Sequence, residues 1–251
     1  MKVIIEDTWN EDGEAEDIIK YCTDNNYEYL LLDPEKIKEL DHQVFFNCIY
    51  FCNTDIVRHH LQEMNLSNNI IPDTYESIYE RFYSRKIEKI NFGDIDINTL
   101  KNPIFIKPTE NDKSFDGSVI SKDDPYTMQL ILASETKPTK ETLVYKSDVV
   151  NFISEYRLLI GNGKLYGSGF ICGKELGSFM EEMNIKKIIE LTDENFRCID
   201  IGFIAEPLHK WAIVEINPPF SLDDHDIPLP NYMNFCIDAC NWINSKVKFI
   251  S

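Results

Sequence analysis

The segment "VEINPPFSLDDHD" at residues 214–226 places an acid and an amide, Glu215 and Asn217, two positions apart at the end of a β-branched stretch. Side chains alternate along a strand, so these two share a face just before Pro218 and Pro219 end it. Carboxylate and carbonyl-type oxygens are the ligands that Mg²⁺ prefers. The spacing therefore suggests part of a divalent-metal site, with a solvated strand end as the alternative.

A second acid joins this face if the two apolar segments around residues 206–209 form a hairpin. With those four residues as its loop, Ala205 faces Lys210. The same register places Asp200 opposite Glu215. Like charges opposite each other destabilise a sheet unless a cation lies between them, and Mg²⁺ would be that cation. A slip of one residue would turn the side chains to the other face.

A metal with few protein ligands usually binds phosphates as well, and an upstream loop could hold them. Lys107 ends the segment "IFIKP", where Pro108 stops a strand ladder. The polar loop "TENDKSFDGSV" follows, and its Lys113 and Gly117 would let an ammonium group and backbone amides approach an anion. A solvated strand end is again the alternative. The loop is not a Walker motif and no GxGxxG precedes a helix, which disfavours P-loop and Rossmann folds.

Arg157 lies inside an apolar segment, "FISEYRLLIG", and shares a strand face with Glu155. An arginine buried in such a strand needs an anionic partner. Glu155 is the structural candidate, whereas a phosphate or a substrate carboxylate that matches the guanidinium fork is the functional one. The "GNGK" that follows at 161–164 predicts a tight hairpin turn.

The elements that position these residues change in character along the chain. Over roughly the first 70 residues strand and helix patterns alternate, as in "KVIIE", "GEAEDIIKYCTDN" and "YEYLLLD", which predicts a small open α/β layer. "QVFFNCIYF" is predicted as its third strand, and "IIPDTYESIYERFYSRKIEKI" as one helix. From about residue 96 short strands come in apparent pairs with segregated helices, which predicts an α+β body.

Charge and cysteine content limit the partners and the compartment. The net charge of −18, from 43 acids and 25 bases, opposes nucleic-acid binding. The longest apolar runs are too short to cross a bilayer, and the acidic start does not fit a signal peptide. Seven cysteines without a Cys-x-x-Cys pair indicate free thiols in a reducing compartment. We expect a soluble protein of the cytoplasm, without a nucleic-acid or membrane partner.

In this order, the lysine strand, the loop, the arginine strand and the Asp with Glu-x-Asn resemble the ATP-grasp superfamily. The wording "FIKPTENDKSFDGSV", "KSDVVNFISEYRLLIGNGKLYG" and "CIDIGF…WAIVEINPPFS" is most similar to the branch named for an arginine and two lysines. Many members of that branch come from viruses and bacterial conflict systems. The resemblance covers about residues 96–222. It implies an α+β ATP-grasp fold, with two α+β subdomains that grip ATP, after a small N-terminal α/β domain.

The resemblance also implies boundaries and roles. The N-terminal domain with its connecting helix would span 1–95 and the ATP-grasp domain 96–251, with a hinge near 145–149. Lys107 would contact the α- and β-phosphates, Lys113 would reach the γ-phosphate, and Arg157 would neutralise the transferred phosphate. The implied site comprises catalytic Arg157 and Lys113; cofactor-binding Lys107, Lys113, Gly117, Tyr145, Lys146, Asp148 and Val149; and metal-binding Asp200, Glu215 and Asn217. Asp148 stands where the family leads us to expect Glu, and the acidic run after Glu-x-Asn is unusual.

The activity implied is that of an ATP- and Mg²⁺-dependent carboxylate–amine ligase. ATP would phosphorylate a carboxylate, and an amine would attack the acyl-phosphate to form an amide, on an amino acid, a peptide or a protein. Lysines, Arg157 and the metal would provide the charge neutralisation that phosphoryl transfer requires. A phosphotransferase with the same grip and a non-catalytic nucleotide-binding module are the alternatives.

Overall fold

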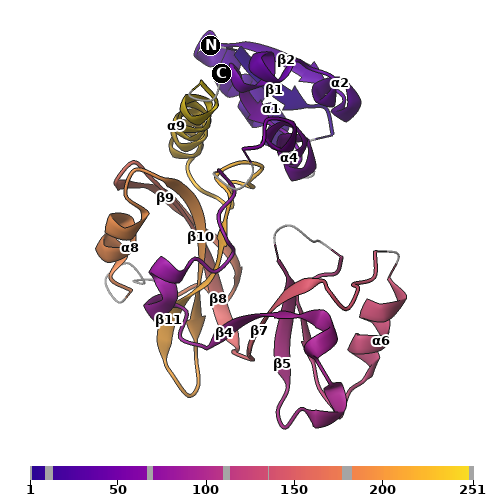
Figure 1. Ribbon diagram of the computed structural model, residues 1–251. Helices are drawn as coiled ribbons and strands as arrows, with labels where there is room; N and C mark the ends of the chain where they lie inside the picture. The colour runs from indigo at the N-terminus through magenta and orange to yellow at the C-terminus, as the bar shows by residue number, and fades with distance from the viewer. Residues whose placement is uncertain are drawn as a thin grey trace.

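A computed structural model describes residues 2–8, 14–66, 70–109, 114–134, 136–176 and 183–248. These residues form a three-stranded sheet of order β2-β1-β3 and two four-stranded sheets of orders β4-β7-β5-β6 and β11-β10-β8-β9. Figure 1 shows the three-stranded layer at the top, beside the C-terminal helix, and the two four-stranded sheets side by side below it. No helix within the described ranges has the length and apolar character needed to cross a membrane.

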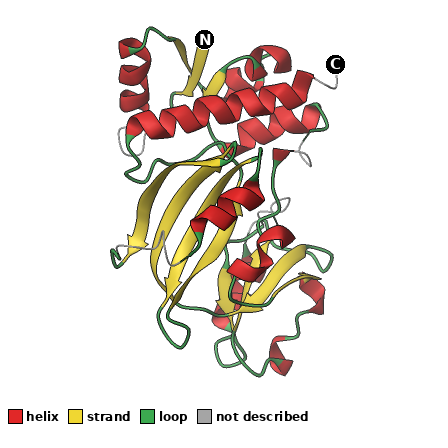
Figure 2. Ribbon diagram, turned by 90° about the vertical axis from the view of Figure 1, so that its left-hand side faces the viewer, coloured by secondary structure: helices red, strands yellow, loops and turns green. Residues whose placement is uncertain are grey.

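The N-terminal layer is the predicted α/β unit, with β1 paired in parallel to β2 and to β3. The C-terminal helix α9 returns to this layer and shares its core, so the two chain ends complete one unit (Figure 2). Its elements are β1 (Lys2–Glu6), α1 (Glu14–Asp24), β2 (Glu28–Leu32), α2 (Pro34–Lys38), α3 (His42–Phe46), β3 (Ile49–Phe51), α4 (Thr54–Glu63) and α9 (Leu229–Lys248).

The prediction of one strand over "QVFFNCIYF" was wrong in its first half, which forms α3. The carboxylate of Asp41 accepts hydrogen bonds from the backbone N–H groups of Gln43 and Val44, at 2.9 and 3.2 Å. These bonds satisfy N–H groups that a helix start leaves open. Local capping therefore overrides the β-branched and aromatic composition of the segment.

The middle sheet carries the predicted lysine strand, and α6 packs on one of its faces. Its elements are β4 (Ile87–Asn91), β5 (Ile104–Pro108), β6 (Ser118–Ile120), α6 (Tyr126–Ala133) and β7 (Leu143–Asp148), with the 3₁₀ turns η2 (Phe92–Asp94) and η3 (Ile97–Thr99). The 3₁₀ turn η1 (Ser77–Phe82) precedes β4 and packs in the core of the third sheet. β4 lies before residue 96 and pairs with β7. The predicted division into 1–95 and 96–251 stays a prediction.

The single helix predicted over "IIPDTYESIYERFYSRKIEKI" was also wrong. The segment contains the short η1 turn and then β4. β4 is antiparallel to β7, with Ile87 opposite Ser147 and Asn91 opposite Leu143. The hydrogen bonds of a strand come from a distant partner, which a short window of sequence does not contain, so the helical spacing of the segment misled the prediction.

The third sheet contains the predicted hairpins and the acidic residues. Asn162 and Gly163 at the first turn have φ values of 49° and 68°, which fit the mirror-image turn that "GNGK" predicts. α8 lies against the sheet and η1. The elements are β8 (Phe152–Gly161), β9 (Lys164–Gly173), α8 (Ile185–Thr192), β10 (Phe196–Ile204) and β11 (Lys210–Asn217).

The predicted register of the last hairpin was wrong at its turn and right at the site. Ile204, rather than Ala205, pairs with Lys210. A bulge between Asp200 and the next residue then restores the register, so Asp200 lies opposite Glu215 as predicted. The longer loop and the bulge each shift the pairing by one residue in opposite directions.

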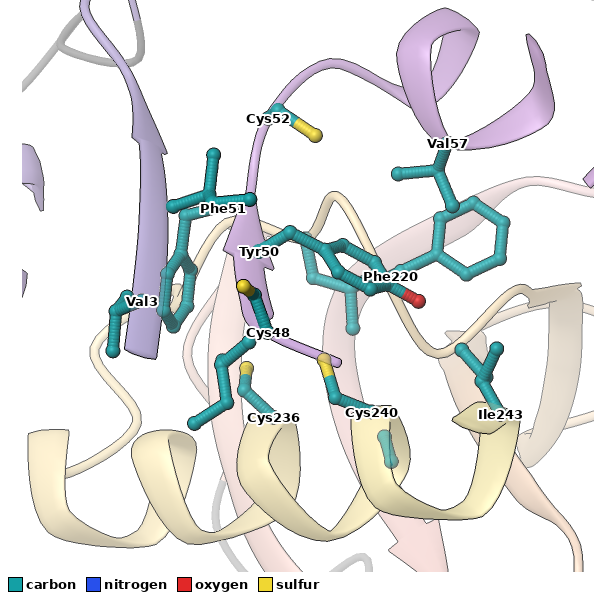
Figure 3. Close-up of a cluster of buried hydrophobic side chains, with 14 of the residues drawn as sticks. Val3, Cys48, Tyr50, Phe51, Cys52, Val57, Phe220, Cys236, Cys240 and Ile243 are labelled. Carbon is teal, nitrogen blue, oxygen red and sulfur yellow. The ribbon is translucent and has the colours of Figure 1, made fainter. Parts of the chain in front are cut away.

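The segment after β11 is anchored in the N-terminal layer. Phe220 enters the core formed by that layer and α9, where it lies close to Tyr50 and Val57 (Figure 3). The hydroxyl of Ser221 donates to the backbone carbonyl of Cys52, at 2.6 Å. The chain that leaves the acidic strand is therefore held against the start of α4.

Candidate active site

Two cavities lie around the residues that the sequence singles out. The first, here named the basic cavity, has a volume of about 320 Å³ and contains the side chains of three cations from three different units of the fold. Its walls are Thr54, Arg58, Lys107, Pro108, Thr109, Phe115, Asp116, Gly117, Arg157, Asn217, Pro218, Phe220, Ser221, Leu222 and Asp223.

The second, here named the hinge cavity, has a volume of about 190 Å³ and is lined largely by aromatic and valine side chains. It includes the segment that links β7 to β8, where the middle sheet continues into the third. Its walls are Tyr75, Arg85, Phe105, Val119, Ser147, Asp148, Val149, Val150, Phe152, Glu155, Val214 and Glu215.

The ion pair between Lys107 and Glu215 lies where the two cavities adjoin. Lys107 lines the basic cavity and Glu215 the hinge cavity, and each side chain is 24% exposed. Burial alone would raise the pKa of Glu215, but the ammonium group of Lys107 and a hydrogen bond from Asn217 hold that pKa below its usual value. The pair connects β5 of the middle sheet to β11 of the third sheet.

Arg157 and Asp200 form a two-pronged ion pair across β8 and β10. The guanidinium Nε and Nη2 atoms donate to the two carboxylate oxygens at 2.9 and 3.0 Å. The two side chains are 12% and 7% exposed, so burial raises the pKa of Asp200 even with the arginine beside it. Sequence reasoning named Glu155 as the structural partner of Arg157, but the partner is Asp200, one strand away.

Asn217 connects the two carboxylates. Its amide nitrogen lies 2.9 Å from Oδ2 of Asp200 and 3.2 Å from Oε1 of Glu215. Amide nitrogen and oxygen are assigned from hydrogen bonds, and a flipped amide would direct its oxygen at the same place. Two carboxylates and an amide oxygen on one face form a donor set that fits Mg²⁺. Within the described residues no three His, Cys, Asp or Glu side chains cluster this way, so the amide is needed.

The loop after β5 is described in part. Lys113 lies outside the described residues, whereas Gly117 lines the basic cavity. A Cβ atom at Gly117 would lie 2.7 Å from the ring of Phe105, so glycine lets this loop pack against the wall of the hinge cavity. One short segment thus contributes to both cavities.

The four predicted hinge residues take different positions. Asp148 and Val149 line the hinge cavity. Tyr145 is buried opposite Lys107, with its hydroxyl donating to the carboxylate of Asp73. Lys146 pairs across the sheet with Ile106 and is not among the described residues that line either cavity. Its ammonium group lies 3.8 Å from the carboxylate of Glu88. The nucleotide-binding roles of all four stay predictions.

Two arginines of the cavities were not singled out from the sequence. Arg58 comes from α4 in the N-terminal layer, and no spacing connects it to the strand residues. Arg85 precedes β4 and donates to the backbone carbonyls of Ile213 and Val214, at 3.0 and 2.8 Å. It thereby holds the bulged strand directly before Glu215. Arg85 lies inside the segment that was predicted as one helix, so no sequence pattern indicated this role.

Two four-stranded sheets joined by the linker between β7 and β8, with lysine, arginine and Glu-x-Asn side chains between them, are typical of the ATP-grasp class. The family model described as "ATP-grasp domain, R2K clade family 2" matches residues 82–234, and the chain belongs to that family. A search of curated proteins finds no match.

Solved structures agree with the fold. A D-alanine–D-alanine ligase from Bacillus anthracis is similar with a TM-score of 0.56 at 11% identity, over 98% of this chain and 99% of that one. The structure of the ligase PsnB with a minimal precursor has a TM-score of 0.52 at 9% identity, over 99% of each chain. A RimK domain protein from Sphaerobacter thermophilus has a TM-score of 0.52 at 11% identity, over 98% of this chain and 99% of that one. The predicted α+β ATP-grasp fold is confirmed.

Proposed function

We propose that this protein is an ATP- and Mg²⁺-dependent carboxylate–amine ligase that works through an acyl-phosphate. The observation that carries the proposal is the chain of side chains Lys107–Glu215–Asn217–Asp200–Arg157, in which each member contacts the next. This row of five side chains joins the basic cavity to the hinge cavity, whose walls are largely apolar. This arrangement suits a ligand with an apolar ring at one end and several negative charges at the other.

The nucleotide would lie across the boundary of the two cavities. The base would enter the hinge cavity, between Phe105 and Val150, where backbone groups of residues 147–149 could read its edge. Its phosphates would then extend past Lys107 into the basic cavity. Lys107 would exchange the carboxylate of Glu215 for a phosphate oxygen and so release Glu215 for a metal ion.

Asp200, Glu215 and Asn217 would hold Mg²⁺. When bound, the ion supplies positive charge that offsets the phosphate oxygens. Without the ion, the negative charges of Glu215 and Asp200 cancel the positive charges of Lys107 and Arg157. A polyphosphate therefore needs the additional charge that the metal brings.

Arg157 would orient the phosphate that is transferred. Its Nη1 atom lies 3.4 Å from the carbonyl oxygen of Asp223, at the wall of the basic cavity. A carboxylate oxygen of the first substrate would attack the γ-phosphorus, and ADP would leave. The amine nitrogen would then attack the acyl carbon. A C–N bond forms, the C–O bond to phosphate breaks, and inorganic phosphate and a proton are released.

We also propose a substrate class, a location, a family branch and a hinge. The substrate class comprises amino acids, peptides and proteins; PsnB, whose structure contains a minimal precursor, is similar in fold. We also propose the cytoplasm as the location, supported by seven free cysteines. The viral and conflict-system branch is proposed from the sequence resemblance alone. The hinge near 145–149 is proposed from its position between β7 and β8.

Release of ADP and of labelled phosphate tests the proposal. The parent protein is incubated with Mg²⁺, γ-labelled ATP and a panel of amino acids and peptides. A ligase releases the label as inorganic phosphate and forms an amide, whereas a phosphotransferase leaves the label on the product. Tight ATP binding without ADP release across the panel would favour a non-catalytic module.

A further inference from the structure

The basic cavity has a third cationic side chain, Arg58, besides Lys107 and Arg157. Lys107 and Arg157 lie within that chain, with Glu215 and Asp200 as partners. Arg58 lines the same cavity from α4, an element of the N-terminal layer. The fold therefore brings a guanidinium group from a separate unit to the space where the phosphates would end.

The position of Arg58 is built into the fold rather than left to a loose contact between units. Ser221 and Phe220, which line the cavity, are fastened to the N-terminal layer by the hydrogen bond to Cys52 and by the shared core. The backbone N–H of Asp224 donates to the carboxylate of Glu14, at 3.0 Å. Three separate contacts thus hold the N-terminal layer, to which α4 belongs, against the segment that follows β11.

The rest of that wall suits a small zwitterion. Thr54, the first residue of α4, also lines the cavity. The preceding Asn53 does not cap the helix with its side chain but donates to the buried Glu6 at 2.6 Å. The Glu6 carboxylate also accepts from the backbone N–H of Asn53, at 2.7 Å, and so offsets the positive end of the helix, which leaves Arg58 as the source of positive charge on this wall. Asp116 and Asp223 line the cavity as well and could attract an ammonium group.

We infer that Arg58 binds a carboxylate that does not react, and that the amine substrate is an amino acid with a free α-carboxylate. The inference rests on the proposed ligase function and deepens it. A guanidinium fork binds a carboxylate through two parallel hydrogen bonds, which an uncharged carboxamide cannot replace. The cavity of about 320 Å³ would also hold the phosphates, so the space that remains suits a small amine substrate.

Calorimetric titration of the full chain tests this without turnover. The protein is loaded with Mg²⁺ and a non-hydrolysable ATP analogue and titrated with the proteinogenic amino acids and their matched carboxamides. We expect at least one free amino acid to bind, and its carboxamide to bind about tenfold or more weakly. Arg58→Ala should bring the amino acid to the affinity of the carboxamide, without change in analogue affinity. Arg58→Lys keeps the charge without the fork and should fall between.

Arg81→Ala is the matched control, because Arg81 is an exposed arginine outside both cavities. If Arg58→Ala lowers the Tm, Arg58→Gln repeats the test with a longer polar side chain. The inference is overturned if no amino acid binds, if the carboxamides bind equally, or if the Arg58 variants weaken the ATP analogue as much as the amino acid. ADP release is measured separately. ADP release without Arg58-dependent amino-acid binding would contradict this inference and leave the ligase proposal standing, whereas Arg58-dependent binding without ADP release would contradict the ligase proposal and leave only a carboxylate-binding site at Arg58.

Discussion

The basic cavity and the hinge cavity adjoin at the Lys107–Glu215 ion pair and differ in the units that build them. Walls of the basic cavity come from α4, the middle sheet and the third sheet with the segment that follows it. The hinge cavity is formed by the two four-stranded sheets, their linker, and Tyr75 and Arg85 before β4. Under the proposed function, a nucleotide base would need two units of the fold, whereas the chemistry at the phosphates would need three.

Under the proposed function, the hinge cavity would bind the base and the basic cavity would surround the reacting phosphate. Burial in an apolar pocket stabilises a bound base in the ground state and the transition state alike. Charged groups around a transferred phosphate act most strongly where charge develops. Changes in the hinge cavity should therefore alter the KM for ATP, and changes in the basic cavity should alter kcat.

The largest effect is expected for Lys107→Met. We expect kcat to fall by about 10²–10³-fold, the usual loss when one charge-stabilising donor is removed. The variant also leaves Glu215 without the cation that lowers its pKa. ADP release at saturating ATP measures the change, and Lys122→Met, an exposed lysine outside both cavities, is the control. A kcat equal to that of the parent would remove Lys107 from the site.

The pH dependence of the N-terminal layer gives the next largest effect. Burial lowers the pKa of His60 from 6.5 to about 4. The folded protein thus resists protonation of His60. The stability that neutral His60 contributes is fully present above pH 6.5 and is lost as the pH falls toward 4. By pH 5 the free energy of unfolding should drop by about 2 kcal/mol. Because α4 carries both His60 and Arg58, the loss should weaken the basic cavity first.

Hydrogen exchange measures this effect, after correction for intrinsic rates. Between pH 7 and pH 5 the amides of β1 and β3 should lose protection before those of β8 and β10. The variant His60→Gln should have a smaller pH dependence, whereas His209→Gln, which changes an exposed loop residue, should match the parent. Equal losses in both sheets would contradict the proposed difference between the cavities.

Val119→Trp should act on the hinge cavity alone. The larger side chain would occupy part of the 190 Å³ space and raise the KM for ATP by about tenfold. We expect kcat at saturating ATP to stay within about twofold of the parent, since the phosphates lie elsewhere. Val119 is 45% exposed, so the fold should tolerate the change. Leu130→Trp, at an exposed position of α6, is the matched control. A loss confined to kcat would contradict the assignment of the hinge cavity to the base.

Gly117→Ala should produce the smallest effect and involve both cavities. The added Cβ would lie 2.7 Å from the ring of Phe105 and push the ring toward the hinge cavity or the loop toward the basic one. We expect changes of about threefold to tenfold shared between KM and kcat, from about 1 kcal/mol of local overpacking. Steady-state kinetics at varied ATP measures both. A change in neither would show that the loop relaxes freely.

Much of the fold follows from patterns that act over a few residues. The strand of Lys2–Glu6, the helix of Glu14–Asp24 and the turn at Asn162 and Gly163 all form as expected, because strand alternation, helical spacing and turn chemistry are local. β4 and α3 do not, because in one case the pairing strand is distant and in the other a cap overrides composition. α6 was not predicted at all.

The sequence alone determined the order of the site residues and the face that Glu215 and Asn217 share, since strand alternation needs no distant partner. Tertiary structure decided with whom they interact. Arg157 pairs with Asp200 rather than Glu155 because β8 and β10 are neighbours. Arg58 reaches the cavity because Phe220 and α9 fix the N-terminal layer there. Such contacts join residues far apart in the chain, so no local pattern contains them.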